Sequence, residues 1–381
     1  MLKIAIIGAG AISRAHIDAY LTFPEKCGIV AVCNHHIDRA EKLIKEKELT
    51  GAKAFDSLEN ALKELKIDVA SVCLPPAEHA KQTIFALNNG VHVLCEKPMA
   101  NSLEECDAMI EAAEKNNVKL AVVCQLRCAS RTQRIKQLLA SGEFGKPLYT
   151  KVDSMWWRGS NYHKMFWRGT WASEGGGVLS GQAIHHLDLT LYLLGMPKSV
   201  TAYMNNVGHD NSECEDIISV SMDYGDYAAQ FNASLVAHGE RQRIDIYTEG
   251  GMMSIPWEVD ASRQMDNGFP EKDAEGMEKL NAAYNALPEL PYENHIGQVF
   301  NFLCAVENGD KLIADGNEGR NVIEVITAAY LSAIEHKSVA LPLDKSCRLY
   351  TLEGKIGNLP HFYEKHESVA SLGDGAITFA K

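Results

Sequence analysis

The first 124 residues alternate short apolar runs with helical stretches, and this alternation constrains the fold more than any other feature. Apolar runs predict strands over residues 3–7, 29–33, 54–56, 69–74, 91–95 and 120–124. Between them, helices are predicted over residues 14–23, 57–66, 80–89 and 102–116. Strands that alternate with helices at this pitch predict an α/β fold with a doubly wound parallel sheet.

A glycine turn follows the first predicted strand. Gly8 permits a tight turn, and Gly10 lets backbone N–H groups approach a pyrophosphate at the start of the next helix, where Ala11 and Ile12 lie. Ser13 replaces the third glycine of the usual pattern and is still small enough for close helix–strand packing. A strand, a glycine turn and a helix in this order predict a dinucleotide-binding (Rossmann) domain.

The second predicted strand ends at Asn34, without the acidic residue that normally binds the ribose of NAD. Asn34 does not repel a 2′-phosphate, and His35, His36 or Arg39 could pair with one. The pattern therefore favours NADP or dual use slightly, although Asn34 can also bind a hydroxyl and the histidines could simply belong to an exposed loop. The expected cofactor is NAD or NADP.

Another predicted strand ends at Glu96-Lys97-Pro98. Pro98 lacks an N–H group and disfavours helical geometry at Lys97, so the strand stops there. Ligands of parallel α/β sheets lie at the carboxyl ends of the strands, where Lys97 could hydrogen-bond a substrate hydroxyl. Taken alone, the motif would more often be a surface ion pair between Glu96 and Lys97.

The pattern changes after residue 125. Strands follow one another over residues 149–155, 200–205, 217–223, 227–235, 243–248 and 252–256, with helices at 130–141, 295–307 and 318–336. This predicts a C-terminal α+β domain with a large, mostly antiparallel open sheet. We expect a dinucleotide-binding domain over residues 1–125 and a substrate-binding and oligomerisation domain over 126–381. Residues 258–294 carry no clear pattern.

Three consecutive glycines, 175–177, precede a predicted amphipathic helix that ends at Leu194. Helical spacing places Gln182, His185 and Asp188 on one face of this helix. Such a histidine and carboxylate suit an oriented acid–base pair, metal ligands or a purely structural pair. No metal site is predicted.

Composition excludes several classes of partner. The net charge of −13 argues against a nucleic-acid groove or an anionic membrane surface. No apolar run approaches the roughly 20 residues of a membrane span, and no signal peptide is evident. The ten cysteines include no Cys-x-x-Cys pair, and several lie in apolar runs, which is typical of reduced core thiols in a cytoplasmic protein.

Together these motifs resemble the Gfo/Idh/MocA family (glucose-fructose oxidoreductase, inositol dehydrogenase and rhizopine catabolism proteins) over nearly the whole chain. The resemblance rests on the glycine turn, the Glu-Lys-Pro strand end, the glycine-rich helix and three smaller features. Those are the turn from Leu74-Pro75 to His79, Arg127, and Leu341-Pro342-Leu343. It implies a Rossmann domain joined to an α/β domain whose sheet forms a homodimer or homotetramer.

The resemblance further implies hydride transfer from a ring hydroxyl carbon of a sugar, glycoside or cyclitol to NAD or NADP. Lys97 and His185 match the catalytic residues of the family, with His185 as the base. One departure concerns the Asp often found four residues before that histidine, which is Gly181 here. Gln182, Asp188 or Tyr162 could take part of its role.

The remaining site residues are expected from the same resemblance and from the aromatic character of residues 156–168. Expected substrate contacts are Arg127, Trp157, Tyr162, Trp167, Arg168, Gln182 and Asp188. Further expected cofactor contacts are Leu74, Pro75, His79, Glu96, Lys97 and Gln125. Two other functions remain open: a redox-assisted glycoside-cleaving enzyme that recycles tightly held NAD, and a non-catalytic nucleotide-sensing regulator.

Overall fold

The computed structural model describes residues 1–370, and residues 371–381, the end of the second predicted domain, lie outside them. A six-stranded parallel sheet occupies the N-terminal part, in the order β3-β2-β1-β4-β5-β6. Its strands are β1 (Leu2–Ile7), β2 (Cys27–Cys33), β3 (Lys53–Phe55), β4 (Val69–Val72), β5 (His92–Cys95) and β6 (Leu120–Val122). The predicted doubly wound parallel sheet is confirmed.

Five helices connect these strands: α1 (Ala11–Leu21), α2 (Ile37–Glu46), α3 (Leu58–Glu64), α4 (Pro76–Asn88) and α5 (Leu103–Lys115). Side-chain caps set two of their beginnings. The hydroxyls of Ser57 and Ser102 accept hydrogen bonds from backbone N–H groups in the first turns of α3 and α5. Pro75 and Pro76 begin α4, where a missing N–H costs nothing.

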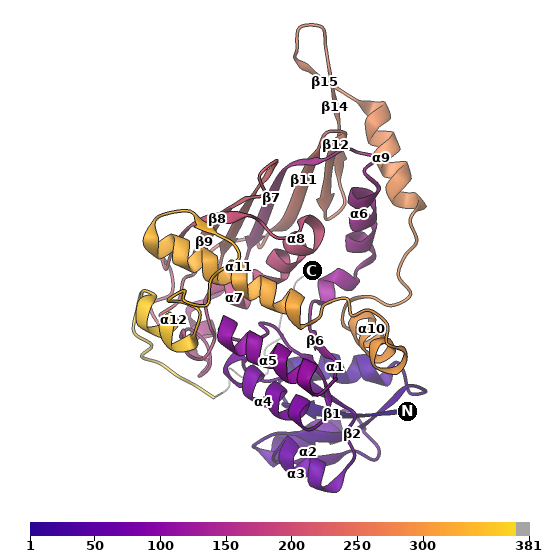
Figure 1. Ribbon diagram of the computed structural model, residues 1–381, viewed down its shortest axis with the longest axis vertical. Coiled ribbons are helices and arrows are strands. Elements are labelled where there is room, and N and C mark those ends of the chain that lie inside the picture. Colours follow the sequence, from indigo (N-terminus) through magenta and orange to yellow (C-terminus); the bar gives the residue numbers. More distant parts are fainter. Residues whose placement is uncertain (371–381) are drawn as a thin grey trace.

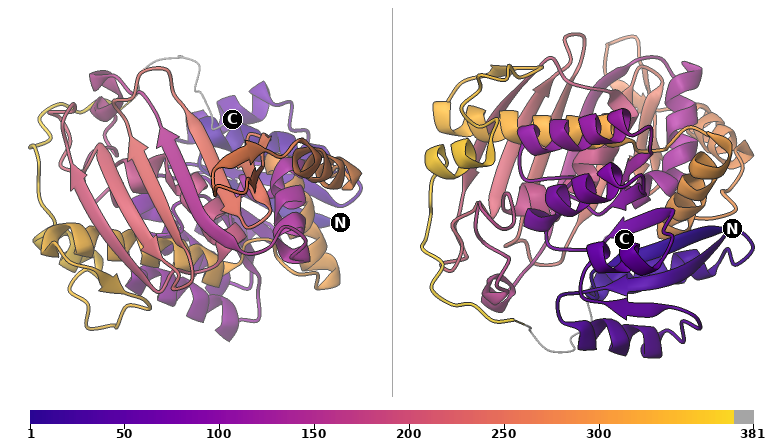
Figure 2. Two further views of the ribbon diagram at one scale, coloured as in Figure 1. Left: turned by 90° about the horizontal axis from the view of Figure 1, so that it is seen from above. Right: turned by 60° about the horizontal axis from the view of Figure 1, so that its bottom comes forward.

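An eight-stranded sheet dominates the second part, in the order β13-β12-β11-β7-β10-β9-β8-β16. Its main strands are β7 (Pro147–Met155), β8 (Ser199–Asn205), β9 (Ile217–Asp223), β10 (Ala228–Ser234), β11 (Gln242–Thr248) and β12 (Gly251–Ile255). The short strands β13 (Val259–Asp260) and β16 (Val339–Ala340) form its edges. Only the β7–β10 pair is parallel, so the expected mostly antiparallel sheet is confirmed. Figure 2 shows this sheet with one face open.

The region without a sequence pattern forms a projecting arm. The strands β14 (Ser262–Gln264) and β15 (Pro270–Lys272) pair as an exposed hairpin, followed by α9 (Ala274–Ala286). Figure 1 shows the hairpin extending beyond the large sheet.

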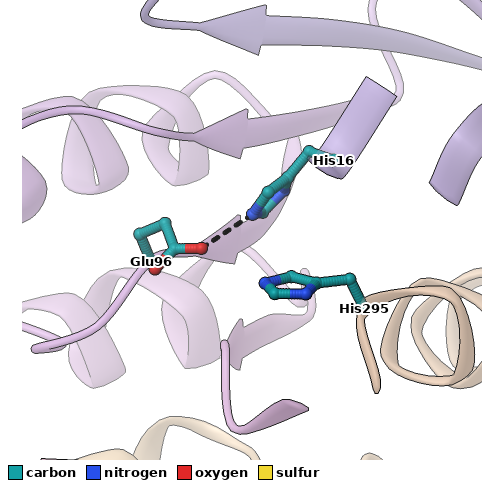
Figure 3. A group of neighbouring side chains, drawn as sticks. All are labelled: His16, Glu96 and His295. Carbon is teal, nitrogen blue, oxygen red and sulfur yellow. Dashed lines mark hydrogen bonds and ion pairs between the residues drawn. The ribbon is translucent and has the colours of Figure 1, made fainter. Parts of the chain in front are cut away.

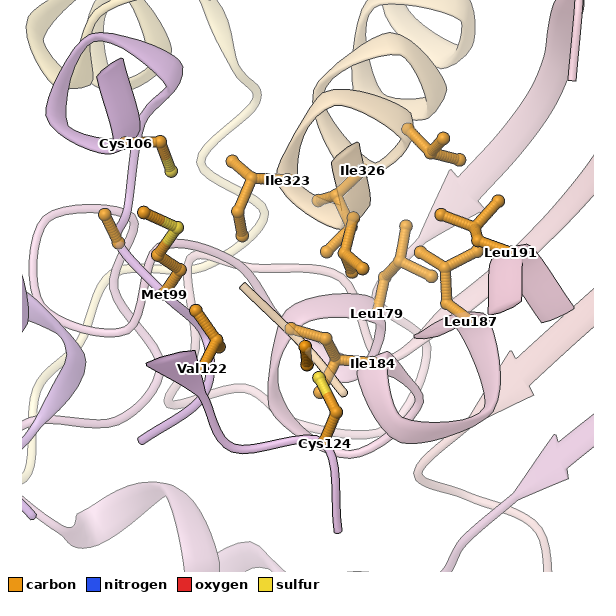
Figure 4. Packing of buried hydrophobic residues seen from close by; sticks show 14 of the residues in the cluster. Met99, Cys106, Val122, Cys124, Leu179, Ile184, Leu187, Leu191, Ile323 and Ile326 are labelled. Carbon is orange, nitrogen blue, oxygen red and sulfur yellow. The ribbon is translucent and has the colours of Figure 1, made fainter. Parts of the chain in front are cut away.

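Two helices in the C-terminal third of the chain join the two sheets into one body. The 20-residue helix α11 (Gly316–Glu335) packs against β8 and α5, and α10 (Asn294–Asn308) packs against α1 (Figure 1). A contiguous apolar cluster runs across the junction, from Met99 and Val122 to Leu187 of α8 (Ile184–Leu194) and Ile323 of α11 (Figure 4). This packing fixes the end of β5 relative to α8.

The expected single helix before Leu194 is wrong. It is divided into α7 (Val178–Gly181) and α8 (Ile184–Leu194), and Gln182 and Ala183 lie between them. Two other helices complete the fold, α6 (Ser130–Ser141) and α12 (Leu352–Asn358). All ten cysteines are free thiols, eight of them buried. None of the helices within residues 1–370 is long and apolar enough to cross a membrane.

Candidate active site

A small cavity lies where the Glu-Lys-Pro turn, the end of β6 and the first turn of α8 meet. Polar groups on two sides of it come from Lys97 and His185, and Asp188 adds a carboxylate. The rest of its lining is mainly apolar: Met99, Val122, Val123, Cys124, Ile184, Gly319 and Val322. The carboxyl ends of β5 and β6 reach this cavity, which is where ligands of parallel α/β sheets bind.

Lys97 spans the junction between the two sheets. Its ammonium group donates a hydrogen bond to the carbonyl oxygen of Gly181, at 2.8 Å. Burial lowers the pKa of Lys97, the carboxylate of Glu96 opposes that shift, and the guanidinium of Arg168 adds to it. An ammonium has three N–H donors, so two remain for a ligand.

His185 is in the first turn of α8 and is half-buried. Its ring has no hydrogen-bond partner among residues 1–370, unlike the neighbouring His186, whose Nδ1 lies 2.8 Å from the hydroxyl of Ser154. Burial holds the pKa of His185 well below its usual value, and the positive charge of Lys97 lowers it further. The imidazole is therefore neutral near pH 7 and able to accept a proton.

Asp188 does not pair with His185. Its carboxylate accepts bonds from Nε and Nη2 of Arg127 at 2.7–3.2 Å, and Arg127 also contacts the carbonyl of Ile313 and the carboxylate of Glu318. The Arg127 side chain is 3% exposed. This buried ion pair ties the start of the second part to α8, and the expected substrate contact of Arg127 stays a prediction.

Aromatic and cationic groups gather between residues 162 and 182. The guanidinium carbon of Arg168 lies 3.9 Å from the ring centres of both Tyr162 and Trp167. The carboxamide of Gln182 donates to the Tyr162 hydroxyl. Four of the expected substrate residues are thus brought together. Trp157 is not among them, because it is 46% exposed and stacks on His238.

The glycine turn after β1 fits the pyrophosphate of a dinucleotide. Gly8 has a φ of +109°, and a Cβ there would lie 2.3 Å from the carbonyl oxygen of Cys73, so only glycine is tolerated. At Gly10 a Cβ would meet nothing within 4 Å, so the space before α1 is open. Gly10 caps α1 without a side-chain bond, and the N–H groups around Ala11 and Ile12 are therefore available to an anion.

The other expected cofactor residues form two groups: those that follow β2, β4 and β6, and the buried pair His79 and Glu96. Asn34 follows β2 and accepts a bond from the His36 N–H at 2.9 Å, while His35 and Arg39 are exposed beside it. Leu74 and Pro75 are half-buried at the end of β4. Gln125 follows β6, and its buried carboxamide oxygen has no partner in the described chain.

His79 and Glu96 are buried and hydrogen-bonded within the protein, and their expected contact with the cofactor stays a prediction. The ring nitrogens of His79 lie 2.7 and 2.8 Å from the carbonyl oxygens of Pro98 and Leu74, so the ring ties two turns together. Glu96 is 5% exposed and accepts bonds from His16 at 2.9 Å and from the Lys97 N–H at 3.1 Å. Both residues position the Lys97 turn.

His16 and His295 were not predicted. Figure 3 shows both rings around the carboxylate of Glu96, and ligand atoms of the three residues lie within 4.8 Å of one another. Burial opposes the charge on His16, but Cys73 and Glu96 raise its pKa to about 10, and the bond from His16 lowers the pKa of Glu96 to about 2. With their 2.9 Å hydrogen bond, these opposite shifts lead us to interpret the group as a buried ion pair of His16 and Glu96. Its only sequence signal was the position of His16 on the inner face of α1.

Comparisons with known proteins agree with the two-part fold. A family model described as an oxidoreductase family with an NAD-binding Rossmann fold matches residues 2–124, and the matching C-terminal domain model covers residues 132–254. The D-glucoside 3-dehydrogenase of Escherichia coli is 34% identical over 205 residues, which are 53% of this chain and 57% of that protein. The match thus spans little more than half of that relative.

Two longer matches cover most of the chain. The scyllo-inositol 2-dehydrogenase (NADP(+)) of Bacillus subtilis is 25% identical over 366 residues, 89% of this chain and 96% of that protein. The WlbA dehydrogenase of Bordetella pertussis, solved with NADH and UDP-GlcNAcA, is 26% identical with a TM-score of 0.77 over 90% of this chain and 98% of that one.

Proposed function

Because the chain belongs to the Gfo/Idh/MocA oxidoreductase family, we propose that it oxidises a ring hydroxyl of a sugar, glycoside or cyclitol with NAD or NADP. The observation that carries this proposal is that Lys97 and His185 line one cavity at the carboxyl ends of β5 and β6. The names of the relatives support the substrate class, since they include glucoside, glucose 6-phosphate and inositol dehydrogenases.

The residues of the cavity suit the proton side of this reaction. When bound, the nicotinamide supplies the hydride acceptor. The two free donors of the Lys97 ammonium hold the substrate oxygen and stabilise the negative charge that develops as its proton leaves. The neutral ring of His185 accepts that proton. A base within hydrogen-bond reach contributes roughly 10²–10⁴-fold.

The aromatic groups near the cavity suit a carbohydrate. We place the apolar face of the sugar ring against Tyr162 and Trp167, whose rings Arg168 already covers from one side at 3.9 Å. Gln182 is positioned by Tyr162 and carries a carboxamide that can bond hydroxyls. We also place the protein in the cytoplasm, which its ten unpaired cysteines support.

A substrate screen tests the proposed function. Sugars, glycosides and cyclitols are offered with NAD and with NADP, while absorbance of the reduced nicotinamide and product mass are followed. We expect a ketone product and stoichiometric reduced cofactor. Product without net reduction would instead select the glycoside-cleaving reaction with recycled NAD. Cofactor binding without any product would select the regulator.

Asn34→Asp should shift cofactor preference toward NAD. A carboxylate at the end of β2 repels the 2′-phosphate of NADP and can bond the ribose of NAD. We expect the ratio of kcat/KM for NAD to that for NADP to rise at least about tenfold, which is ~1.4 kcal/mol. Asn89→Asp adds the same charge between α4 (Pro76–Asn88) and β5, away from the end of β2, and should leave the ratio unchanged. An unchanged ratio in Asn34→Asp would remove this residue from the cofactor site.

We further propose that the open face of the large sheet forms a homodimer or homotetramer. Four of its apolar side chains are exposed: Leu148, Tyr149, Tyr203 and Tyr247. Replacing Tyr203 and Tyr247 together by Lys should lower the mass measured by light scattering to that of a smaller species. A wild-type protein that is already monomeric at micromolar concentration would contradict the proposal.

A further inference from the structure

Glu174 is a buried carboxylate for which the proposed reaction has so far provided no role. It lies in the loop before the three glycines and is 3% exposed. Its Oε1 accepts a bond from Arg168 at 2.6 Å, and its Oε2 accepts one from the Gly169 N–H at 2.7 Å. Burial raises the pKa of Glu174, and the guanidinium of Arg168 and the bond from Gly169 oppose that shift by stabilising the carboxylate.

The position of this carboxylate relative to Lys97 is set by Gly181. A Cβ built on Gly181 would lie 3.4 Å from Oε1 of Glu174, and the carbonyl of the same glycine accepts the bond from Lys97. Glu174 therefore approaches from the side on which residue 181 would carry a side chain. A Cβ at position 181 would be in ordinary van der Waals contact with this carboxylate, and a longer side chain there would extend beside it.

Charges around Lys97 show why a carboxylate is needed there. Arg168 disfavours the ammonium form of Lys97, and Glu96 favours it, but Glu96 is already committed to His16. Glu174 is the other carboxylate that favours the ammonium, and it also neutralises Arg168 through their direct ion pair. Glu174 thus reduces the repulsion between Arg168 and Lys97, and it also attracts the ammonium of Lys97 itself.

We propose that Glu174 supplies the carboxylate of the active site, as a positioning residue that holds Lys97 in its ammonium form beside His185. This inference rests on the proposed function, because it concerns the charge state in which Lys97 meets the substrate hydroxyl. Glu174 acts through Lys97 and Arg168. The helix carries a glycine at position 181, and the carboxylate is instead supplied by Glu174 in the preceding loop.

The test moves the carboxylate from position 174 to position 181. Four forms are compared: wild type, Glu174→Gln, Gly181→Asp and the double variant Glu174→Gln/Gly181→Asp. Gln keeps the size of Glu and one oxygen for either Arg168 or Gly169, and the contact of 3.4 Å leaves room for a Cβ at position 181. Glu213→Gln is the control, because Glu213 bonds the Trp171 N–H of the same loop without acting on the charge of Lys97.

The first readout requires no turnover. Acetylation of Lys97 by acetic anhydride is followed over pH by peptide mass spectrometry, and its midpoint reports loss of the ammonium proton. We expect the midpoint to fall by about one pH unit in Glu174→Gln, to rise in Gly181→Asp and to return toward wild type in the double variant. Glu213→Gln should match wild type.

The second readout is the pH profile of kcat/KM. Its alkaline limb should move in the same directions as the labelling midpoint, while the acid limb, which belongs to His185, stays in place. We expect Glu174→Gln to lower kcat more than it raises KM. An unchanged labelling midpoint in both single variants would overturn the inference. Absence of turnover with every substrate class would instead overturn the proposed function, so the two failures are distinguishable.

Discussion

Replacing Lys97 by Met is expected to lower kcat/KM by about 10²–10⁴-fold, the range that a positioned proton-handling group contributes. Met has nearly the same length and apolar character as the lysine stem, so the turn after β5 should keep its packing. The change removes the hydrogen bond to the Gly181 carbonyl and the ammonium of a residue that lines the cavity. The rate is measured with the best substrate of the screen.

Two controls separate chemistry from folding in this experiment. Lys81→Met makes the same change on the exposed face of α4 and should leave kcat/KM unchanged. Cofactor affinity of Lys97→Met, measured by calorimetry, should remain within about tenfold of wild type, because the pyrophosphate is held at the glycine turn. Near-normal turnover in Lys97→Met would contradict the proposed mechanism.

Replacing Arg127 by Met should destabilise the protein by about 3–5 kcal/mol, because it leaves the buried carboxylate of Asp188 without its cation. Arg127 makes three bonds to that carboxylate, at 2.7–3.2 Å, and its side chain is 3% exposed. It also bonds the carbonyl of Ile313, which the variant leaves unsatisfied. The free energy of unfolding is measured by denaturant titration.

The double variant Arg127→Met/Asp188→Leu tests the cause of that loss. If an unpaired charge is responsible, removing it should recover part of the stability, even though the ion pair is gone. A loss below about 1 kcal/mol in Arg127→Met would contradict this account, because it would show that water reaches Asp188.

Elements with a strong local pattern were predicted from the sequence. Helix α6 (Ser130–Ser141) and strand β9 (Ile217–Asp223) have the predicted bounds, because apolar spacing determines both and turn residues limit them. The arm over residues 258–294 gave no such signal. Its hairpin strands β14 and β15 are exposed throughout, so no buried face imposes a period on them.

The sequence indicated candidate site residues but not the pairings between them that the structure shows. His185 and Asp188 share the spacing of a helix face, but Asp188 pairs with Arg127, 61 positions earlier. The bond between His16 and Glu96 joins residues 80 positions apart. Such partners are chosen by packing between elements, which a single sequence does not reveal. The break at Gln182 was missed because the apolar spacing continues across it.

A crystal structure with bound NAD or NADP and substrate tests the central claim most directly. The account predicts that the hydroxyl to be oxidised lies within about 2.6–3.2 Å of both the Lys97 ammonium and a ring nitrogen of His185, with its carbon facing the nicotinamide. A complex in which either side chain points away from the substrate and the nicotinamide would contradict it.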